Sequence, residues 1–279
     1  MNAASHFVDL RGLRFHYIEW GRPDAIPLVA LHGLRSYAET FEALAAALGD
    51  GYRVISVDQR GRGRSDWDPE RRYDTLTYVA DLEALIDHLG LTRFHLLGHS
   101  MGGANAIVYA GEHPDKVASL IVEDMGPGAS ASSDGAARIK RELANTPDSF
   151  PDWDSGARFW RSMRPNVTEA AIASRVEHSM MDDGTGRIVW RHDQAGIAAA
   201  RLSIPPIDLW PYALAICCPI LLLRGAQSDF LSEATAVAMA ERLPKLTHVP
   251  VEGAGHYVHD DAPEFFNATV RRFLDAQAL

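Results

Sequence analysis

The segment Leu96-Leu97-Gly98-His99-Ser100-Met101-Gly102-Gly103-Ala104-Asn105 decides the fold. An apolar strand, Phe94–Leu97, leads into its Gly-x-Ser-x-Gly sequence, and a helix of small residues, Ala104–Ala110, follows. A strand, a tight turn and a helix around such a serine form a nucleophile elbow. The turn strains the serine backbone, and the two flanking glycines remove side chains that would collide across it. We therefore expect the Ser100 hydroxyl to stand clear of the sheet, facing the first amides of the helix.

The whole chain has the composition of one large globular domain. It has 279 residues, of which 47% are hydrophobic, and a net charge of −10 that argues against nucleic-acid or anionic-membrane partners. The N-terminus lacks a charged start followed by an apolar stretch, and the apolar runs are far too short to span a membrane. We expect a soluble, cytoplasmic protein. The twelve histidines are scattered without metal-ligand spacing, which predicts no metal site.

Buried strands and helices alternate along most of the chain. This alternation predicts an α/β fold with a mostly parallel, helix-flanked sheet. The predicted strands are 6–10, 13–20, 27–31, 52–57, 94–98, 117–122, 219–223 and 247–251, and the predicted helices include 41–48, 76–89, 234–243 and 263–278. The pattern stops between residues 128 and 212, a stretch with four of the six tryptophans and no buried strand. We expect a core of residues 1–127 and 213–279 and a mostly helical lid over 128–212, whose aromatic residues imply an apolar pocket.

A serine hydroxyl needs a base, and histidine has the appropriate pKa. His256 follows the last core strand in Gly253-Ala254-Gly255-His256, where glycines let the loop bring the imidazole over the carboxyl edge of the sheet. His259 is a weaker candidate because it lies toward the closing helix. The imidazolium also needs a carboxylate. Asp124 and Asp229 each follow a core strand, and their positions alone leave both open.

Hydrolysis through a tetrahedral intermediate also needs donors for the oxyanion. The backbone amide of Met101, directly after the nucleophile, is one. The second is expected from the loop after the strand 27–31, at the backbone amide of Leu34 in His32-Gly33-Leu34-Arg35. The side chains of Leu34 and Met101 would then mainly shape the pocket.

Taken together, His32-Gly33, Asp58-x-Arg60-Gly61-x-Gly63-x-Ser65, Gly98-His99-Ser100-Met101-Gly102-Gly103 and Gly253-Ala254-Gly255-His256 resemble the α/β-hydrolase superfamily over the whole core. In that superfamily the acid usually stands three residues after the glycine of a Gly-x-x-Asp turn, and here Ser228 holds that position, with Asp229 one residue later. One branch, which includes small esterases and amidohydrolases, has Asp-x-Gly-Pro after the post-nucleophile strand, as in Asp124-Met125-Gly126-Pro127. The resemblance therefore favours Asp124 over Asp229 as the acid.

These features predict a cofactor-free serine hydrolase that acts on a small-molecule acyl substrate, as a monomer or homodimer. The expected substrate is a small carboxylic ester, with an amide or lactone as variants. Two alternatives stay open: a carbon–carbon bond hydrolase of a diketone-like ring-cleavage product, and a non-catalytic ligand-binding protein on the same fold. Arg158, Arg161 and Arg164 are interpreted as surface arginines of a helix rather than as carboxylate ligands.

Overall fold

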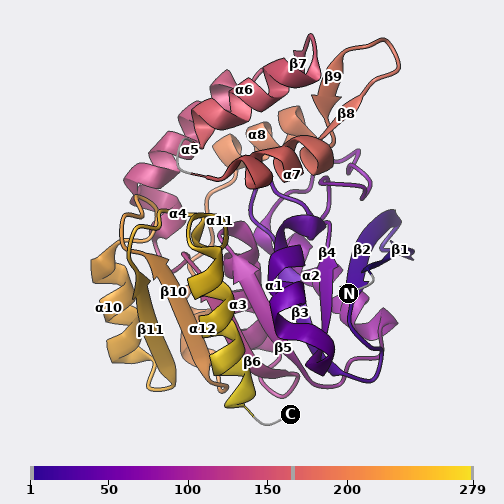
Figure 1. Ribbon diagram of the computed structural model, residues 1–279. Helices are drawn as coiled ribbons and strands as arrows, with labels where there is room; N and C mark the ends of the chain where they lie inside the picture. Colours follow the sequence, from indigo (N-terminus) through magenta and orange to yellow (C-terminus); the bar gives the residue numbers. More distant parts are fainter. Residues whose placement is uncertain (1–2, 165–166, 278–279) are drawn as a thin grey trace.

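The computed structural model describes residues 3–164 and 167–277. A single eight-stranded sheet crosses the molecule in the order β1-β2-β4-β3-β5-β6-β10-β11 (Figure 1). Its strands are β1 (Ala3–Leu10), β2 (Leu13–Trp20), β3 (Ile26–Leu31), β4 (Tyr52–Val57), β5 (Phe94–His99), β6 (Val117–Glu123), β10 (Ile220–Gly225) and β11 (Leu246–Val251). The predicted core strands are confirmed, most of them to within a residue or two at either end.

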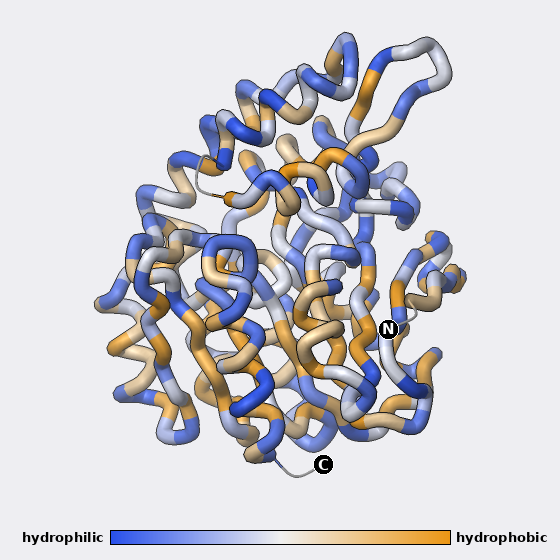
Figure 2. Tube along the Cα trace, in the orientation of Figure 1, coloured by the Kyte–Doolittle hydropathy of each residue, from blue (hydrophilic) through white to orange (hydrophobic). Residues whose placement is uncertain are grey.

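The first two strands run antiparallel to their neighbours, and all the others pair in parallel. Because parallel strands need crossovers, helices cover both faces of this part of the sheet. Every residue of β5, β6 and β10 is accordingly buried. Figure 2 shows the apolar residues gathered along these central strands. The carboxyl ends of the parallel strands meet at one edge, which is where a site is expected.

Two apolar clusters flank the sheet. On one face α1 and α12 pack together, and they lie in front of the sheet in Figure 1. On the other face α2 and α3 pack against each other, and α10 belongs to the same cluster. The core helices are α1 (Glu42–Leu48), α2 (Thr75–His88), α3 (Met101–Glu112), α10 (Glu233–Arg242), α11 (Val258–Asp261) and α12 (Pro263–Asp275), with short 3-10 turns η1 (Ala38–Phe41) and η2 (Gly49–Gly51). The last helix ends at Asp275, earlier than its predicted end at residue 278, which itself lies outside the described residues.

The segment between β6 and β10 lies above the carboxyl edge of the sheet (Figure 1). It contains α4 (Ala129–Ser132), α5 (Asp134–Asn145), α6 (Trp153–Met163), α7 (Glu169–Ser179), α8 (Gln194–Ser203) and α9 (Trp210–Ala215). It also contains a small antiparallel sheet, β7 (Ser149–Phe150), β8 (Met180–Asp182) and β9 (Ile188–Trp190), in the order β7-β9-β8. The expectation of no buried strand here is wrong, because Ile188 and Trp190 are buried. These strands have only two or three residues, too short for a periodicity to show in the sequence.

The expected end of the lid at residue 212 falls inside α9, which packs on α3 of the core. A Cβ at Gly111 of α3 would lie 2.5 Å from the carbonyl oxygen of Tyr212. The small residue in α3 therefore permits close contact with α9. We refer below to the inserted segment from α4 to α8 as the cap.

The Asp58-to-Ser65 loop is organised by its own polar side chains. Asp58 is fully buried, and its carboxylate accepts hydrogen bonds from the backbone amides of Ala38, at 2.7 Å, and Arg64, at 2.9 Å. The Arg60 guanidinium pairs with both Asp68 and Asp81. This loop thereby joins β4, η1 and α2, as expected for a structural motif.

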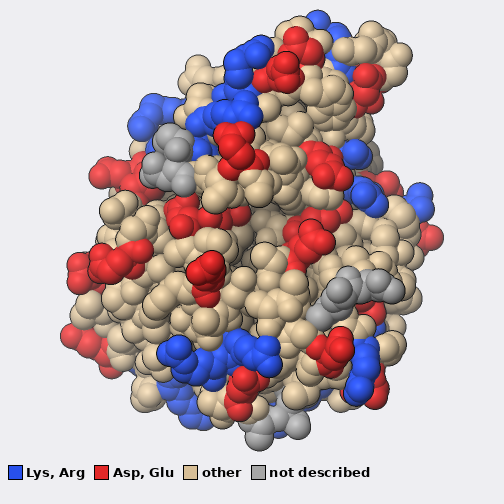
Figure 3. Space-filling view, in the orientation of Figure 1, with Lys and Arg blue, Asp and Glu red and all other residues tan. Residues whose placement is uncertain are grey.

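Among the described residues, none of the helices is both long and apolar enough to cross a membrane. The face shown in Figure 3 carries acidic and basic side chains side by side.

Candidate active site

Ser100 lies at the turn between β5 and α3 in the strained conformation expected of it. Its φ is 52° and its ψ is −116°, so it is one of the few non-glycine residues with a positive φ. A Cβ at Gly98 would lie 2.2 Å from the carbonyl oxygen of Gly102, and a Cβ at Gly102 would lie 2.2 Å from that of Leu31. Glycine is thus required at both positions because the backbone segments touch.

Ser100, His256 and Asp124 form one hydrogen-bonded chain. The Ser100 Oγ is 2.9 Å from Nε2 of His256, and Nδ1 of the same ring is 2.6 Å from Oδ2 of Asp124. With Nδ1 donating to Asp124, Nε2 is left to accept the serine proton. All three residues are buried, with exposed fractions of 6% or less. The loop after β11 therefore brings His256 to the elbow, as the sequence predicted.

The structure places Asp124, and not Asp229, beside His256. The Asp229 carboxylate instead pairs with the Arg138 guanidinium, with N–O distances of 2.7 and 2.9 Å. Ser228 donates its hydroxyl to Oδ2 of Asp124 at 2.5 Å, and the Gly225 amide donates to Oδ1 at 3.2 Å. Ser228, where the superfamily usually has its acid, thus contacts the carboxylate that Asp124 supplies.

Burial shifts the pKa values of His256 and Asp124 in opposite directions. It lowers the pKa of the His256 imidazole below its ordinary value of 6.5, and the positive charges of Arg164 and Arg138 act in the same direction. Burial raises the pKa of Asp124, against the hydrogen bonds from Ser228 and Gly225, which lower it. The imidazole is therefore neutral at pH 7, the form in which a general base can accept a proton.

The two residues predicted to supply the oxyanion donors, Leu34 and Met101, lie near Ser100. Leu34 and Met101 line the same cavity as Ser100, and Met101 is the first residue of α3, where helix amides have no intrahelical acceptor. The loop of Leu34 is held by His32, whose Nδ1 donates to the Gly33 carbonyl and whose Nε2 accepts from the amide of Gln59. Both predicted donors are thus on segments held by hydrogen bonds of their own.

Arg62 contacts both Leu34 and Met101, and no sequence motif predicts this role for it. Its Nε donates to the Leu34 carbonyl at 3.1 Å, and one Nη lies 3.4 Å from the sulfur of Met101. The guanidinium is fully buried beside the rings of Tyr73 and Tyr78. The only sequence signal was its place in a basic run, Arg60 to Arg64, which resembles an ordinary charged loop.

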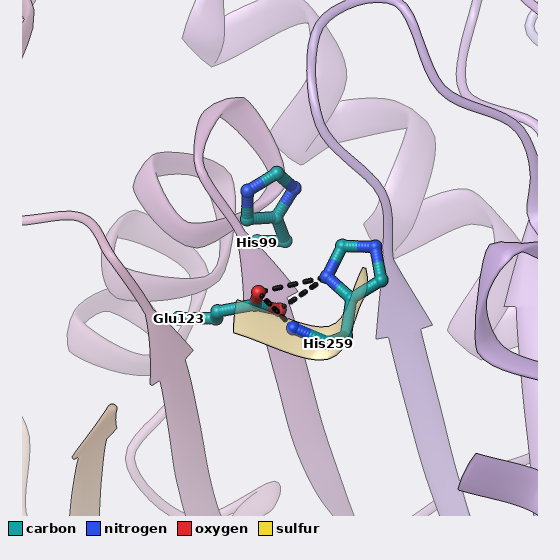
Figure 4. Close-up of side chains that lie close together, drawn as sticks. All are labelled: His99, Glu123 and His259. Atoms are coloured by element: carbon teal, nitrogen blue, oxygen red, sulfur yellow. Dashed lines mark hydrogen bonds and ion pairs between the residues drawn. The ribbon is translucent and has the colours of Figure 1, made fainter. Parts of the chain in front are cut away.

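A second polar cluster consists of His99, Glu123 and His259 (Figure 4). His99 and Glu123 each precede a member of the hydrogen-bonded chain, and His259 follows His256 by three residues. The backbone amide of His259 donates to Glu123 at 2.9 Å and its Nδ1 at 2.7 Å, while Nε2 of His99 donates to the His256 carbonyl at 3.0 Å. His259 thus contacts Glu123 rather than Ser100.

The same three side chains are the one group, among the described residues, that could hold a metal ion. Their ligand atoms lie within 4.8 Å of one another, a proximity that the scattered histidines of the sequence did not predict. The Glu123 carboxylate already accepts hydrogen bonds from His259, and the pairing raises the pKa of His259 although burial opposes it. This arrangement is that of a buried ion pair supporting the loop of His256.

A comparable Ser-His-Asp chain lies at the other end of the sheet. Ser5 Oγ is 2.8 Å from Nε2 of His16, whose Nδ1 is 2.7 Å from Oδ2 of Asp58. Ser5, however, lies within the regular strand β1, without a positive φ and without a helix beginning beside it. Hydrogen-bond distances alone therefore do not distinguish the two serines, whereas the strained turn and the helix N-terminus do.

Ser100 opens into a cavity of about 630 Å³ between the core and the cap. Its wall is mainly apolar and includes residues of α3, α5 and α8 as well as the segment 204–209. This size and character are typical of a site for a small organic molecule.

The strained serine, the order of the site residues and the parallel sheet define the α/β-hydrolase class. The sequence model of the α/β-hydrolase fold family matches residues 26–263, and the chain belongs to this family. It is a hydrolase related to small hydrolases and esterases.

Particular relatives are similar over nearly the whole chain. A 2-(acetamidomethylene)succinate hydrolase of Mesorhizobium japonicum is 32% identical, over 89% of this chain and 88% of its own. A 3-hydroxybutyrate-oligomer hydrolase of Cupriavidus necator is also 32% identical, over 87% of both chains. The crystal structure of an E-2-(acetamidomethylene)succinate hydrolase superimposes with a TM-score of 0.89 and 28% identity, covering 99% of this chain and all of the other.

Proposed function

We propose that the protein is a cofactor-free serine hydrolase that cleaves a small carboxylic ester through an acyl-enzyme. The observation that carries this proposal is the chain from Ser100 through His256 to Asp124, with distances of 2.9 and 2.6 Å. A strained serine at a helix N-terminus, bonded to a neutral imidazole, has the arrangement of an activated nucleophile.

In the proposed reaction the Ser100 oxygen attacks the ester carbonyl while Nε2 of His256 takes its proton. The amides of Leu34 and Met101 stabilise the oxyanion, and Asp124 stabilises the imidazolium. The imidazolium then protonates the departing alcohol, leaving the acyl group on Ser100. Water, deprotonated by His256, attacks this acyl-enzyme and releases the carboxylic acid and the free serine.

The names of two relatives point to different scissile groups. The 3-hydroxybutyrate-oligomer hydrolase is named after a substrate that is an ester. The 2-(acetamidomethylene)succinate hydrolase is named after a substrate that is an amide. A hydroxyl nucleophile with an oxyanion hole is suited to both, and an ester has the better leaving group. We therefore propose the ester as the principal substrate and regard the amide as a slower one.

The first experiment combines turnover with labelling. The protein is expected to release p-nitrophenol from p-nitrophenyl butyrate, and Ser100→Ala is expected to reduce kcat/KM by at least about 10³-fold. A fluorophosphonate probe should label Ser100 once per chain, as located by peptide mass spectrometry.

Ser5→Ala is the matched control, because Ser5 has a similar hydrogen-bonded chain without the strained turn. It should leave both turnover and labelling unchanged. Labelling at Ser5 instead of Ser100, or ester hydrolysis undiminished in Ser100→Ala, would contradict the proposal. Tight ligand binding without turnover would point to a non-catalytic binding protein.

A further inference from the structure

Two arginines on the wall of the Ser100 cavity have no carboxylate partner. Arg62 and Arg201 both line the cavity, and neither has an acidic group within 4.0 Å in the described part of the chain. Other arginines at the boundary of core and cap are paired: Arg35 with Glu142, Arg138 with Asp229, and Arg175 with Asp260. Two guanidinium groups on the cavity wall are therefore not neutralised by an ion pair in the described residues.

The donors of Arg62 are mostly used within the protein. They bond to the carbonyls of Leu34 and Arg60, the hydroxyl of Tyr78 and the sulfur of Met101. Arg62 is thus held in place by these bonds. It contributes positive charge to the cavity, but it has few N–H groups left to donate to a ligand.

Arg201 differs because most of its donors are unused. It lies on α8 of the cap and is partly buried, and among the described residues its one hydrogen bond joins an Nη to the Ser130 carbonyl at 3.1 Å. Its remaining N–H groups have no protein acceptor in that part of the chain. Burial lowers the pKa of Arg201, with no neighbouring carboxylate to raise it. A planar guanidinium with unused donors is suited to bind a carboxylate.

Two carboxylates also line the cavity, and they do not meet this charge. Asp74 caps α2, accepting hydrogen bonds from the amide and the hydroxyl of Thr77. Asp208 is exposed to solvent and accepts from the amide of Trp210. In the described part of the chain, neither carboxylate forms an ion pair with Arg62 or Arg201.

We propose that the cavity selects esters that carry a free carboxylate away from the scissile bond, and that Arg201 binds this carboxylate. The inference rests on the proposed function and specifies its substrate class. The apolar wall contacts the carbon chain between the two ends of the substrate, and Arg62 adds attraction for the negative end. Arg201 is in this sense a specificity residue, because it contacts substrate remote from the reacting atoms.

The test compares charged with neutral esters of matched length. On the acyl side, the 4-nitrophenyl monoesters of succinic, glutaric and adipic acids are compared with methyl-terminated 4-nitrophenyl esters. On the alcohol side, 4-acetoxybenzoate is compared with phenyl acetate. The protein is expected to have a KM at least about tenfold lower for a charged ester in one of the two series.

Arg201→Gln should raise the KM for that charged ester by about 10- to 100-fold, while the kinetics on the neutral ester change by less than about threefold. The neutral ester also reports that the variant is folded. Arg201→Lys should retain part of the preference, since a point charge remains without the fork. The matched control is Arg161→Gln, which removes a cap arginine that is exposed and pairs with Glu169.

Each result has one meaning. If the protein hydrolyses neutral esters but shows no preference in either series, or if Arg201→Gln slows charged and neutral esters equally, Arg201 is not a carboxylate ligand. If neither class of ester is hydrolysed, the proposed function itself fails. If Arg161→Gln raises the KM for the charged ester as much as Arg201→Gln does, the preference comes from the net charge of the cap and not from a contact with Arg201.

Discussion

The carboxylate beside His256 belongs to a residue in an uncommon backbone conformation. Asp124 has a φ of 48°, and only a few non-glycine residues of the chain have a positive φ. This turn at the end of β6 brings the side chain under the imidazole, where Ser228 and Gly225 donate to its two oxygens. Strain at such a position is retained where the surrounding structure fixes it, and it is concentrated at functional sites.

Asp124→Asn is expected to lower kcat by about 10³- to 10⁴-fold, because the amide no longer stabilises the imidazolium and favours the wrong tautomer. Asp229→Asn should change kcat by less than about threefold, since the Asp229 side chain pairs with Arg138 at a half-exposed position. Ester turnover of the two purified variants decides between them. The larger loss in Asp229→Asn would reverse the assignment.

Ser228 offers a gain-of-function test of the same prediction. Its Oγ is 2.5 Å from Oδ2 of Asp124, so a carboxylate introduced there should reach the same ring nitrogen. Ser228→Asp in the Asp124→Asn background is expected to recover turnover by at least about tenfold. In the wild-type background the same substitution crowds two carboxylates together and should not increase turnover.

At the scale of the elements, neighbouring strands carry two layers of polar residues. β5 and β6 pair with His99 opposite Glu123. Ser100 directly follows His99 in the chain, and Asp124 directly follows Glu123. Because successive side chains along a strand point to opposite faces, the first pair lies behind the second. His259 of α11 closes this layer by its bonds to Glu123 (Figure 4).

The Glu123–His259 pair should make stability depend on pH in a defined window. Burial raises the pKa of Glu123, but the positive charge of His259 lowers it below 4.5, so the contribution is lost as pH falls through the folded value. Burial lowers the pKa of His259, but the negative charge of Glu123 raises it, and the folded value lies above 6.5. The contribution of the pair to stability is therefore lost as pH rises through this folded value. The full contribution therefore lies between pH 4.5 and 6.5, the ordinary values of the two groups.

Glu123→Gln should thus lower the free energy of unfolding by about 3–5 kcal/mol within this window and by less at pH 9. Urea unfolding of both proteins at several pH values measures this difference. Asp260 and Arg175 also face His259, with opposite effects on its pKa, and they are present in both proteins. A difference that stays constant from pH 5 to pH 9 would show that the pair does not titrate as described.

For the whole molecule, the joint between cap and core contains buried charge. Arg175 of α7 is 2% exposed and pairs with Asp260 of α11, in the element that follows His256. Its guanidinium also lies 5.0 Å from the ring of Tyr257. Arg164, expected on the surface, is instead 9% exposed and donates to the Tyr257 hydroxyl. The helix pattern placed Arg158 and Arg161 correctly, but it could not show that the core covers the end of α6.

Asp260→Asn leaves the Arg175 cation buried without its partner and is expected to lower the free energy of unfolding by about 3–5 kcal/mol. Glu169→Gln, which breaks the exposed pair with Arg161, should cost less than about 1 kcal/mol. Urea unfolding at pH 7 compares the two. Equal, small effects would mean that the cap is not anchored through this pair.

Short-range patterns in the chain are enough to predict its local features. The strands of the core, the elbow at Ser100 and the loop that ends at His256 each depend on periodicity, glycine placement and apolar runs, which act over a few neighbouring residues. The motifs further determined the fold class, because parallel buried strands require helices on both faces.

Which side chains contact one another depends instead on the folded arrangement of the whole chain. It places Asp124 at His256 and Asp229 at Arg138, pairs Glu123 with His259, and buries Arg164. Among the described residues it also leaves Arg201 without a carboxylate partner. The physical reason is that these contacts join residues far apart in the chain. Their partners depend on backbone angles at single turns and on how the cap lies over the core, which no local pattern records.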